Sequence, residues 1–402
     1  MANDYVFKDS LPVAPLKIAA LESCKDLAAR VNDHIVQFRR NDIEELKRRQ
    51  EDLHYRGYDV DSYLLDFKCP RFGTGEAKAV INESVRGTDV FAMVDVTNYS
   101  IPYTVFGHTN HMSPDDHFQD LKRIIGACGS TAHRVNVIMP FLYESRQHKR
   151  SKRESLDCAM ALEELATMGV SNIITFDAHD PRVQNAIPLI GFDNFMPTYQ
   201  FVKALFSHDH NISLDKDHLM IISPDEGAMN RAVYLANNLG VDMGMFYKRR
   251  DYSTVVNGRN PIVAHEFLGT SVEGKTVLII DDMISSGESM LDTAKELKER
   301  KAAKVIVCCT FGLFTSGLEK FDEFYLKGYM DYVITTNLNY RPKELLERPW
   351  YLEADMSKYL AAIINALNHD RSISASLNPT EKIQNLVQRY QSGGYEYYQK
   401  LV

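Results

Sequence analysis

The segment from residue 276 to residue 290 constrains the fold of this chain more than any other. Its apolar run, 277–280, is rich in β-branched residues and too short for a helix, which is typical of a buried strand in a parallel sheet. Asp281 and Asp282 follow directly, and small residues then lead into a helical pattern that starts near Glu288. Because ligands of open α/β sheets bind at the carboxyl ends of the strands, the segment predicts a binding site there.

The chemistry of this segment indicates a phosphorylated sugar. Two adjacent carboxylates suit a pair of neighbouring hydroxyl groups. The small residues allow backbone N–H groups and hydroxyls to converge on an anion at the positive end of the helix. A diol at one end and a phosphate at the other describe ribose 5-phosphate, and the residues expected to bind it are Asp281, Asp282, Ser285, Ser286, Gly287, Glu288 and Ser289. An acidic turn followed by an N-cap serine is the plainer alternative.

A second motif competes for the phosphate-binding role. Residues 269–276 satisfy the P-loop pattern G-x-x-x-x-G-K-[ST]. A P-loop must follow a strand and open a helix, whereas Lys275 and Thr276 lead directly into the apolar strand. We therefore interpret residues 273–275 as an ordinary turn.

Composition indicates a globular protein of two or three domains. The chain has 402 residues, of which 45% are hydrophobic and 25% charged, and a net charge of −8. That charge argues against a nucleic-acid partner, whose binding surface would be basic. No apolar run is long enough to span a membrane, and the charged first nine residues do not fit a signal peptide, so we expect a cytoplasmic protein without a membrane partner. The six cysteines form no C-x-x-C pair, which argues against a disulfide or metal framework.

Apolar strand-like runs alternate with helical periodicity along the chain, which is typical of parallel sheets wrapped by helices. Strands are predicted at residues 16–20, 63–67, 90–94, 134–139, 173–176, 219–223, 242–247, 276–280, 304–310 and 332–335. We therefore expect an α/β fold of two similar domains, each a mainly parallel sheet flanked by helices, at residues 1–200 and 201–374. A charged helical insert at about 38–60, interpreted as a solvated helix, and a C-terminal tail at 375–402 are added to this plan.

Further motifs match one protein family in their order and spacing. They are Arg71–Glu76, Glu83–Val90, Pro140–Gln147, Phe176–His179, Ser223–Gly227, Lys248–Arg250 and the segment described above. Together they resemble the ribose-phosphate pyrophosphokinase (PRPP synthetase) family over about residues 16–374. The resemblance implies a phosphoribosyltransferase-type fold for both domains. It also implies Mg²⁺-dependent transfer of the diphosphate of ATP to the anomeric hydroxyl of ribose 5-phosphate, which gives PRPP and AMP.

The resemblance also assigns roles to individual residues. Lys248 and Arg250 begin a polar loop predicted to reach about Glu266, and we expect them to clamp the transferred phosphate oxygens as the catalytic cations. Asp225 and His179 are the expected Mg²⁺ ligands, although imidazole is not the ligand that Mg²⁺ prefers. ATP is expected to contact Phe72, Glu76, Arg146 and Gln147.

The family further implies a homo-oligomer built from dimers, up to a hexamer, in which the Phe72 loop serves the active site of a neighbouring subunit. Three residues depart from the family pattern. Thr74 stands where Asp or Asn is usual, and Ser285 and Glu288 replace an Asp and a Gly of the ribose-phosphate loop. A carboxylate beside a phosphate is repelled unless it points away, so Glu288 is the odd substitution.

A non-catalytic, PRPP-synthetase-associated regulatory subunit is the alternative interpretation of the same resemblance. A chain that had lost turnover would have little reason to keep every expected site residue. The enzyme is favoured by the joint presence of Lys248, Arg250, Asp225, His179, Asp281 and Asp282.

Overall fold

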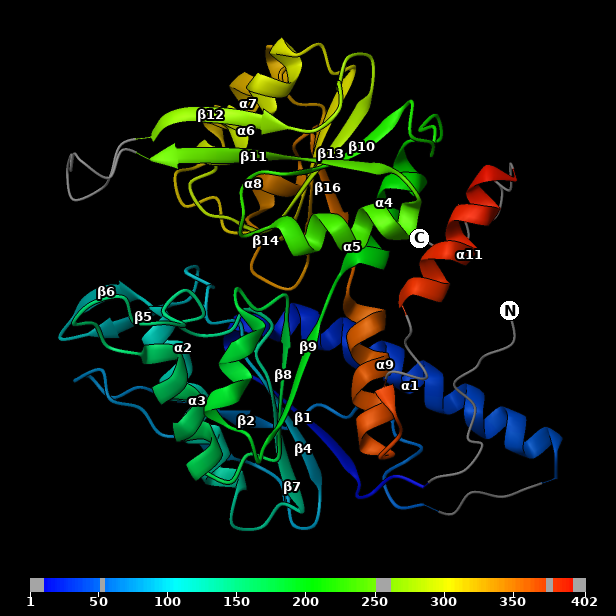
Figure 1. Ribbon diagram of the computed structural model, residues 1–402. Coiled ribbons are helices and arrows are strands. Elements are labelled where there is room, and N and C mark those ends of the chain that lie inside the picture. The colour runs from blue at the N-terminus through cyan, green and yellow to red at the C-terminus, as the bar shows by residue number, and fades with distance from the viewer. Residues whose placement is uncertain (1–10, 51–54, 251–261, 374–378, 393–402) are drawn as a thin grey trace. The chain divides into compact units, whose positions relative to one another are not determined.

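A computed structural model of the chain describes residues 11–50, 55–250, 262–373 and 379–392 (Figure 1), without the side chains of residues 248–250 and 262–265. The chain divides into two compact units. Unit 1 comprises Met1–Met196, Asn337–Tyr340 and Met356–Asn378, and unit 2 comprises Pro197–Thr336, Arg341–Asp355 and Pro379–Val402. This division differs from the predicted one, because the chain returns to unit 1 twice after residue 336. In the described part of the chain, no helix is both long and apolar enough to cross a membrane.

Unit 1 is built on a five-stranded parallel sheet. Its strands, in spatial order, are β1 (Leu16–Ala20), β4 (Asp89–Met93), β7 (Arg134–Ile138), β8 (Asn172–Phe176) and β9 (Gly191–Phe195). Alternate residues of the sheet, such as Val90 and Ala92, pack in one buried cluster with α2 (Pro114–Cys128) and α3 (Asp157–Thr167). Helices α1 (Lys25–Arg48) and α9 (Ser357–Asn368) lie side by side in this unit (Figure 1).

Unit 1 also contains smaller elements outside its main sheet. Two short antiparallel pairs are β2 (Phe67–Lys68) with β3 (Val80–Ile81), and β5 (Pro102–Val105) with β6 (His108–His111). Two 3-10 helices, η1 (Glu22–Cys24) and η2 (Pro181–Ala186), follow strand ends of the main sheet. The β5–β6 hairpin carries exposed polar side chains and lacks a strong apolar alternation, so the sequence pattern did not predict it.

Unit 2 is built on a seven-stranded sheet. Its spatial order is β12 (Ile262–Leu268), β11 (Asp242–Arg250), β10 (Leu219–Ser223), β13 (Thr276–Ile284), β14 (Lys304–Gly312), β15 (Tyr332–Thr336) and β16 (Tyr351–Ala354), with only β12 antiparallel among these strands. On one face, Val277 and Ile279 pack with α6 (Glu288–Glu299), α7 (Glu319–Leu326) and the short α8 (Lys343–Leu346). On the other, Leu278 and Ile280 pack with α4 (Thr198–His208), α5 (Met229–Leu239) and α11 (Pro379–Gln391). Burial on both faces explains why the apolar run of β13 does not alternate.

Nine of the predicted strands are present, with ends that differ by a few residues, and the prediction at 63–67 was wrong. There the chain makes only an isolated bridge beside β1, where the Ile18 N–H donates to the Tyr63 carbonyl and the Leu65 N–H donates to the Ile18 carbonyl, both at 2.8 Å. The chain then turns away into β2. The prediction omitted β9, β12 and β16, which lie at the edges of the two sheets.

The charged helix was predicted to be a solvated addition, which holds for exposed side chains such as Arg40 and Lys47 but is wrong for Arg39. α1 is one continuous helix from Lys25 to Arg48, and Arg39 within it is only 1% exposed. The Arg39 guanidinium lies 4.6 Å from the ring centroids of both Tyr58 and Tyr63. It donates hydrogen bonds to Asn365 at 3.2 Å and Asn368 at 2.6 Å, both on α9. Because these partners satisfy the buried charge, α1 and α9 are joined in the interior of unit 1.

The predicted C-terminal tail is partly a component of unit 2. Helix α11 buries Ile383, Leu386 and Tyr390 in the cluster that also contains α4 and α5. The Tyr390 ring stacks on Phe206 with centroids 4.1 Å apart, and its hydroxyl accepts a hydrogen bond from the Ile212 N–H at 2.9 Å. Residues 379–391 are therefore part of the core and not an added segment.

Candidate functional site

The strand that the sequence singled out lies at the centre of unit 2. β13 begins at Thr276, so Lys275 and Thr276 lead into a strand and the rejection of a P-loop is confirmed. The strand continues past the predicted end to Ile284, and Asp281 pairs in register with Cys309 of β14. The two aspartates are therefore the sixth and seventh of the nine residues of a central parallel strand, toward the edge where ligands of α/β sheets bind.

Three carboxylates gather at this edge of unit 2. Asp282 is buried, Asp281 is half-buried, and Asp225 follows β10, which is the strand beside β13. Burial raises the pKa of the Asp281 carboxyl, and the negative charges of Asp282 and Asp225 raise it further. The Arg231 guanidinium lies 3.8 Å from the Asp282 carboxylate and partly offsets this charge. Hydroxyl donors or a cation would relieve the remaining repulsion.

The small-residue loop turns sharply between β13 and α6. Gly287 has a φ of +85°, and a Cβ at this position would meet the Phe321 ring at 2.4 Å, so a residue with a side chain does not fit. The loop is also held by the segment that follows β14, because the Thr315 N–H donates to the Ser285 carbonyl at 3.0 Å. Gly287 brings no side chain to the N-terminus of α6, where backbone N–H groups attract anions.

Glu288 does not leave an unpaired negative charge in the loop. Its exposed carboxylate forms an ion pair with Lys320 of α7 at 2.8 Å. The hydrogen bond and charge of Lys320 lower the pKa of the Glu288 carboxyl. The carboxylate that departs from the family pattern is thus directed to α7, which removes the objection that it would repel a phosphate.

Lys248 and Arg250 lie at the end of β11, and their side chains are outside the described part of the structure. Lys248 pairs in register with His265 of the antiparallel β12. The predicted long loop is therefore shorter than expected, because Ile262–Leu268 is a strand. The catalytic role of the two cations stays a prediction.

In unit 1, the expected nucleotide residues Phe72 and Glu76 lie on one tight turn. The Phe72 N–H donates to the Glu76 carbonyl at 2.7 Å, and the Gly75 N–H donates to the Phe72 carbonyl at 2.9 Å. Both Phe72, which is 52% exposed, and Glu76 reach the surface. The Thr74 hydroxyl donates to the Glu76 carboxylate at 2.9 Å, so this departure from the family pattern holds the carboxylate within the turn.

The other expected residues of unit 1 follow β7 and β8. Arg146 is exposed, and the Gln147 amide donates to the Ser155 carbonyl at 2.9 Å. The exposed His179 follows β8, and its ring lies 5.4 Å from that of His148, measured between centroids. Sequence reasoning left His148 within a basic run, where only its position next to Gln147 could have drawn attention to it.

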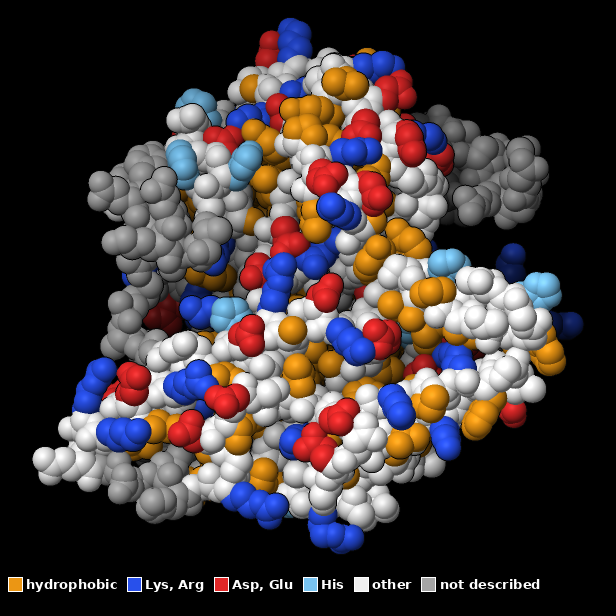
Figure 2. Space-filling view, turned by 180° about the vertical axis from the view of Figure 1, so that it is seen from behind, with side chains coloured by type: hydrophobic (Ala, Val, Ile, Leu, Met, Phe, Trp, Pro, Cys, Tyr) orange, Lys and Arg blue, Asp and Glu red, His pale blue; other side chains and the backbone are white. Residues whose placement is uncertain are grey.

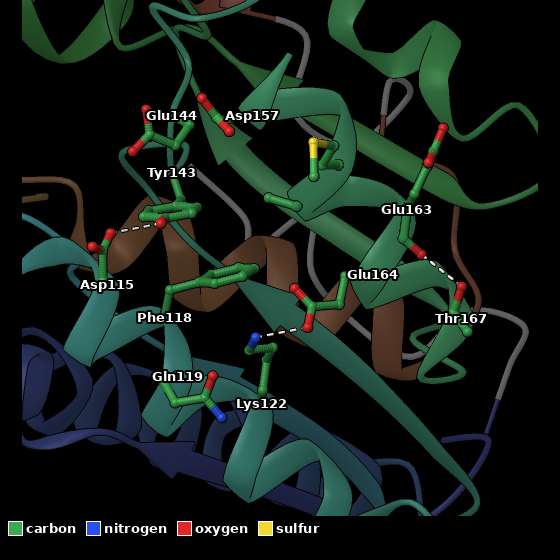
Figure 3. Close-up of a pocket in the computed structure, with 12 residues that line it drawn as sticks. Asp115, Phe118, Gln119, Lys122, Tyr143, Glu144, Asp157, Glu163, Glu164 and Thr167 are labelled. Atoms are coloured by element: carbon green, nitrogen blue, oxygen red, sulfur yellow. Dashed lines mark hydrogen bonds and ion pairs between the residues drawn. The ribbon is translucent and has the colours of Figure 1, made fainter. Parts of the chain in front are cut away.

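A cavity of about 880 Å³ lies between α2 and α3 (Figure 3), apart from all these residues. Phe118 stacks on Tyr143 inside it with ring centroids 4.3 Å apart, and the Tyr143 hydroxyl donates to Asp115 at 2.6 Å. Its other acidic lining residues are Glu144, Asp157, Glu163 and Glu164. This lining does not suit a phosphorylated ligand, because the carboxylates would repel it.

Figure 2 shows acidic and basic side chains interspersed over the coloured part of the face it presents. A nucleic-acid-binding face would gather basic side chains into one patch or stripe.

The chain is similar to known proteins along both units. Residues 16–169 match the N-terminal domain of ribose phosphate pyrophosphokinase, and residues 198–335 match the phosphoribosyl transferase domain. A ribose-phosphate pyrophosphokinase of Vibrio parahaemolyticus is 28% identical over 319 residues, which are 78% of this chain and 92% of the relative. One of Staphylococcus haemolyticus is 30% identical over 247 residues, which are 60% of this chain and 69% of the relative.

The fold is also that of a solved structure. The crystal structure of phosphoribosylpyrophosphate synthetase from Mycobacterium smegmatis matches with a TM-score of 0.66 and 21% identity, over 89% of this chain and 99% of that chain. Both units are thus phosphoribosyltransferase-type α/β domains. With both domain models matched in order and a relative 30% identical over most of its length, the chain belongs to the ribose-phosphate pyrophosphokinase family.

Proposed function

We propose that this protein is a Mg²⁺-dependent ribose-phosphate diphosphokinase. It transfers the diphosphate of ATP to the anomeric hydroxyl of ribose 5-phosphate. The hydroxyl oxygen bonds to the β-phosphorus, the bond from that phosphorus to the α-phosphate bridging oxygen breaks, and PRPP, AMP and one proton are released. The observation that carries the proposal is the gathering of Asp225, Asp281 and Asp282 beside the Ser285–Gly287 turn in unit 2. The relatives named above are pyrophosphokinases, so the regulatory-subunit alternative finds no support in them.

The sugar site is proposed at the edge of β13. The Asp281 and Asp282 carboxylates accept hydrogen bonds from the two ring hydroxyls, which would offset the burial and the repulsion that raise the pKa of Asp281. The 5-phosphate is held by backbone N–H groups at the start of α6 and by the hydroxyls of Ser285, Ser286 and Ser289. Glu288 can stay near this phosphate because Lys320 neutralises its charge.

The nucleotide contacts are proposed for residues of unit 1. The exposed Phe72 ring offers a face for adenine, and Glu76 supports the same nucleotide from the other side of the turn. Arg146 and Gln147 contact the phosphates or ribose of ATP. Since negative charge builds on the transferred oxygens, Lys248 and Arg250 are proposed to stabilise it as fixed cations.

The donor set fits a magnesium ion. Asp225 offers a carboxylate, whose oxygens are hard ligands. One of these oxygens, Oδ1, accepts a hydrogen bond from the Gly227 N–H at 2.9 Å. Among the described residues, no three His, Cys, Asp or Glu side chains are placed to hold a metal ion together. Mg²⁺ takes few protein ligands and fills its shell with water and phosphate. When bound, Mg²⁺ would neutralise charge on the diphosphate oxygens, with Asp225 of unit 2 as its proposed ligand, while the metal role expected for His179, in unit 1, stays a prediction.

We further propose a homo-oligomer built from dimers, in which the Phe72 turn serves the active site of a neighbouring subunit. The exposure of Phe72 and Glu76 supports this assignment, because a large apolar ring in the solvent has reason to meet a partner surface.

Product analysis tests the proposed function. The full chain is incubated with Mg²⁺, ATP and ribose 5-phosphate, and AMP and PRPP are measured together. We expect equal amounts of both, and neither without ribose 5-phosphate. Formation of ADP would instead indicate transfer of a single phosphoryl group, and AMP without PRPP would indicate hydrolysis. Either product pattern, or no turnover, would refute the proposal.

A further inference from the structure

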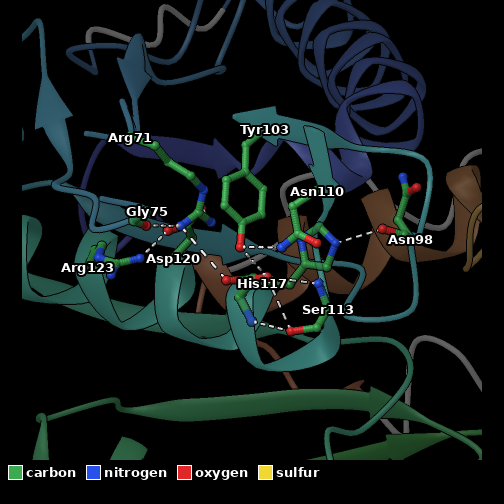
Figure 4. Close-up of polar contacts among 10 residues, drawn as sticks. Arg71, Gly75, Asn98, Tyr103, Asn110, Ser113, His117, Asp120 and Arg123 are labelled. Carbon is green, nitrogen blue, oxygen red and sulfur yellow. Dashed lines mark hydrogen bonds and ion pairs between the residues drawn. The ribbon is translucent and has the colours of Figure 1, made fainter. Parts of the chain in front are cut away.

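The turn that contains Phe72 is closed by Arg71, a residue to which the sequence assigned no role in binding or catalysis. The Arg71 side chain is only 10% exposed. Its guanidinium donates to the Gly75 carbonyl at 3.2 Å, across the turn, and to the Asp120 carboxylate of α2 at 3.0 Å (Figure 4). Arg71 therefore joins both ends of the turn to a helix of the unit 1 core.

The face of this guanidinium is covered by the β5–β6 hairpin. The Tyr103 ring of β5 lies under Arg71, with 4.5 Å between the guanidinium carbon and the ring centroid. The Tyr103 hydroxyl accepts a hydrogen bond from the Asn110 amide of β6 at 2.8 Å and donates to Asp116 of α2 at 3.3 Å. Asp116 also caps α2 through Ser113. The ring is thus held by the hairpin and by the helix at the same time.

The hairpin also contacts the backbone of the turn directly. The Phe106 N–H donates to the Gly73 carbonyl at 2.8 Å. A Cβ at Gly75 would lie 3.1 Å from a methyl carbon of Val105, so glycine allows the close approach, and its φ of +91° also requires glycine. The hairpin therefore contacts both residues that flank Thr74 at the tip of the turn.

We infer that the β5–β6 hairpin, through Tyr103, is the positioning element that presents Phe72 to the nucleobase. The inference rests on the proposed function, because the ligand of Phe72 is the adenine of ATP. An exposed five-residue turn without such support would lose conformational freedom on binding. The hairpin removes that freedom beforehand, so Tyr103 is a positioning residue for ATP affinity and does not itself touch the nucleotide.

Three variants test this role in steady-state assays. Tyr103→Leu removes the aromatic face under Arg71, and we expect a rise of about tenfold in KM for ATP, with kcat and KM for ribose 5-phosphate near parental. Tyr103→Phe keeps the ring and loses only the hydroxyl contacts, so its KM for ATP should rise less than about threefold. Thr104→Ala is the matched control, because Thr104 is exposed and its side chain points to the opposite face of β5.

A second readout requires no turnover. The chain has one tryptophan, Trp350, which is fully buried, so a Phe72→Trp variant places one exposed fluorophore on the turn. Adding Tyr103→Leu should lower the fluorescence anisotropy of this fluorophore and increase its quenching by acrylamide, while adding Thr104→Ala should change neither. If Tyr103→Leu does not fold, Val105→Ala, which trims the contact to Gly75, takes its place in both assays.

The outcomes separate the inference from the function on which it rests. An unchanged anisotropy in the Tyr103→Leu background would overturn the positioning role. A lowered anisotropy with an unchanged KM for ATP would overturn its link to the nucleotide. If the parent chain forms no PRPP, the proposed function fails on its own, and the anisotropy alone then decides whether the hairpin positions the turn.

Discussion

Replacing Asp281 by asparagine separates binding of the sugar from the stability of the strand that carries it. The asparagine would keep the shape of the side chain and an oxygen that accepts the Asp282 N–H, which now donates to Asp281 at 2.9 Å. What is lost is one negative charge that is proposed to accept a ribose hydroxyl. A hydrogen bond to a charged group contributes about 1.5–3 kcal/mol, so the Kd for ribose 5-phosphate should rise about 10- to 150-fold.

The effect of Asp281→Asn on stability should have the opposite sign. Burial and the charges of Asp282 and Asp225 raise the pKa of Asp281 in the folded state above its unfolded value. The folded state then binds more protons, so stability falls as pH rises from the ordinary carboxyl pKa through the raised one. Above that window the ionised Asp281 destabilises the fold. The variant should therefore unfold at the parental temperature or higher at neutral pH, and its stability should depend less on pH.

Calorimetry measures the Kd for ribose 5-phosphate and the Kd for ATP, and thermal unfolding at several pH values measures the stability. ATP binding should stay near parental. Asp292→Asn is the matched control, since Asp292 is an exposed carboxylate of α6 and its loss changes the net charge equally. The reasoning is refuted if Asp281→Asn weakens the binding of ribose 5-phosphate and of ATP equally, or if it lowers the unfolding temperature. Either result would indicate a collapsed strand end.

Three other perturbations test the remaining assignments. Lys248→Ala should lower turnover by at least about a hundredfold with little change in unfolding temperature, and a rate within threefold of the parent would remove its catalytic role. Phe72→Ala and Arg146→Ala should each be inactive, but a co-refolded mixture should recover activity if each active site is built from two subunits. Mixed oligomers that are confirmed by mass analysis and show no recovery would refute the shared site. Arg39→Met should lower the free energy of unfolding by about 1–3 kcal/mol in denaturant titrations, because it leaves the buried side-chain oxygen of Asn365 without its donor, whereas Arg40→Met, at a half-exposed side chain, should change it by less than about 1 kcal/mol.

Much of the fold and of the candidate site could be predicted from local sequence patterns. The apolar run before Asp281 predicted a central strand because burial on both faces leaves a continuous hydrophobic signal within a few residues. The same reasoning identified the P-loop pattern as a chance match, since it depends only on which element follows Lys275. Edge strands such as β9 and β16 were missed, because half-buried strands carry a weaker and more polar pattern.

The sequence alone determined which strands could be central, where the two aspartates and the glycine turn lie along the chain, and which family the motifs resemble. The tertiary structure alone decided the partners of charged side chains. It buries Arg39 against Asn368 across 329 positions, turns Glu288 toward Lys320, and places Tyr103 under Arg71. A charge run has the same local pattern whether it is solvated or buried. Only the long-range partner, which no local pattern specifies, determines whether the cost of desolvating the charge is offset.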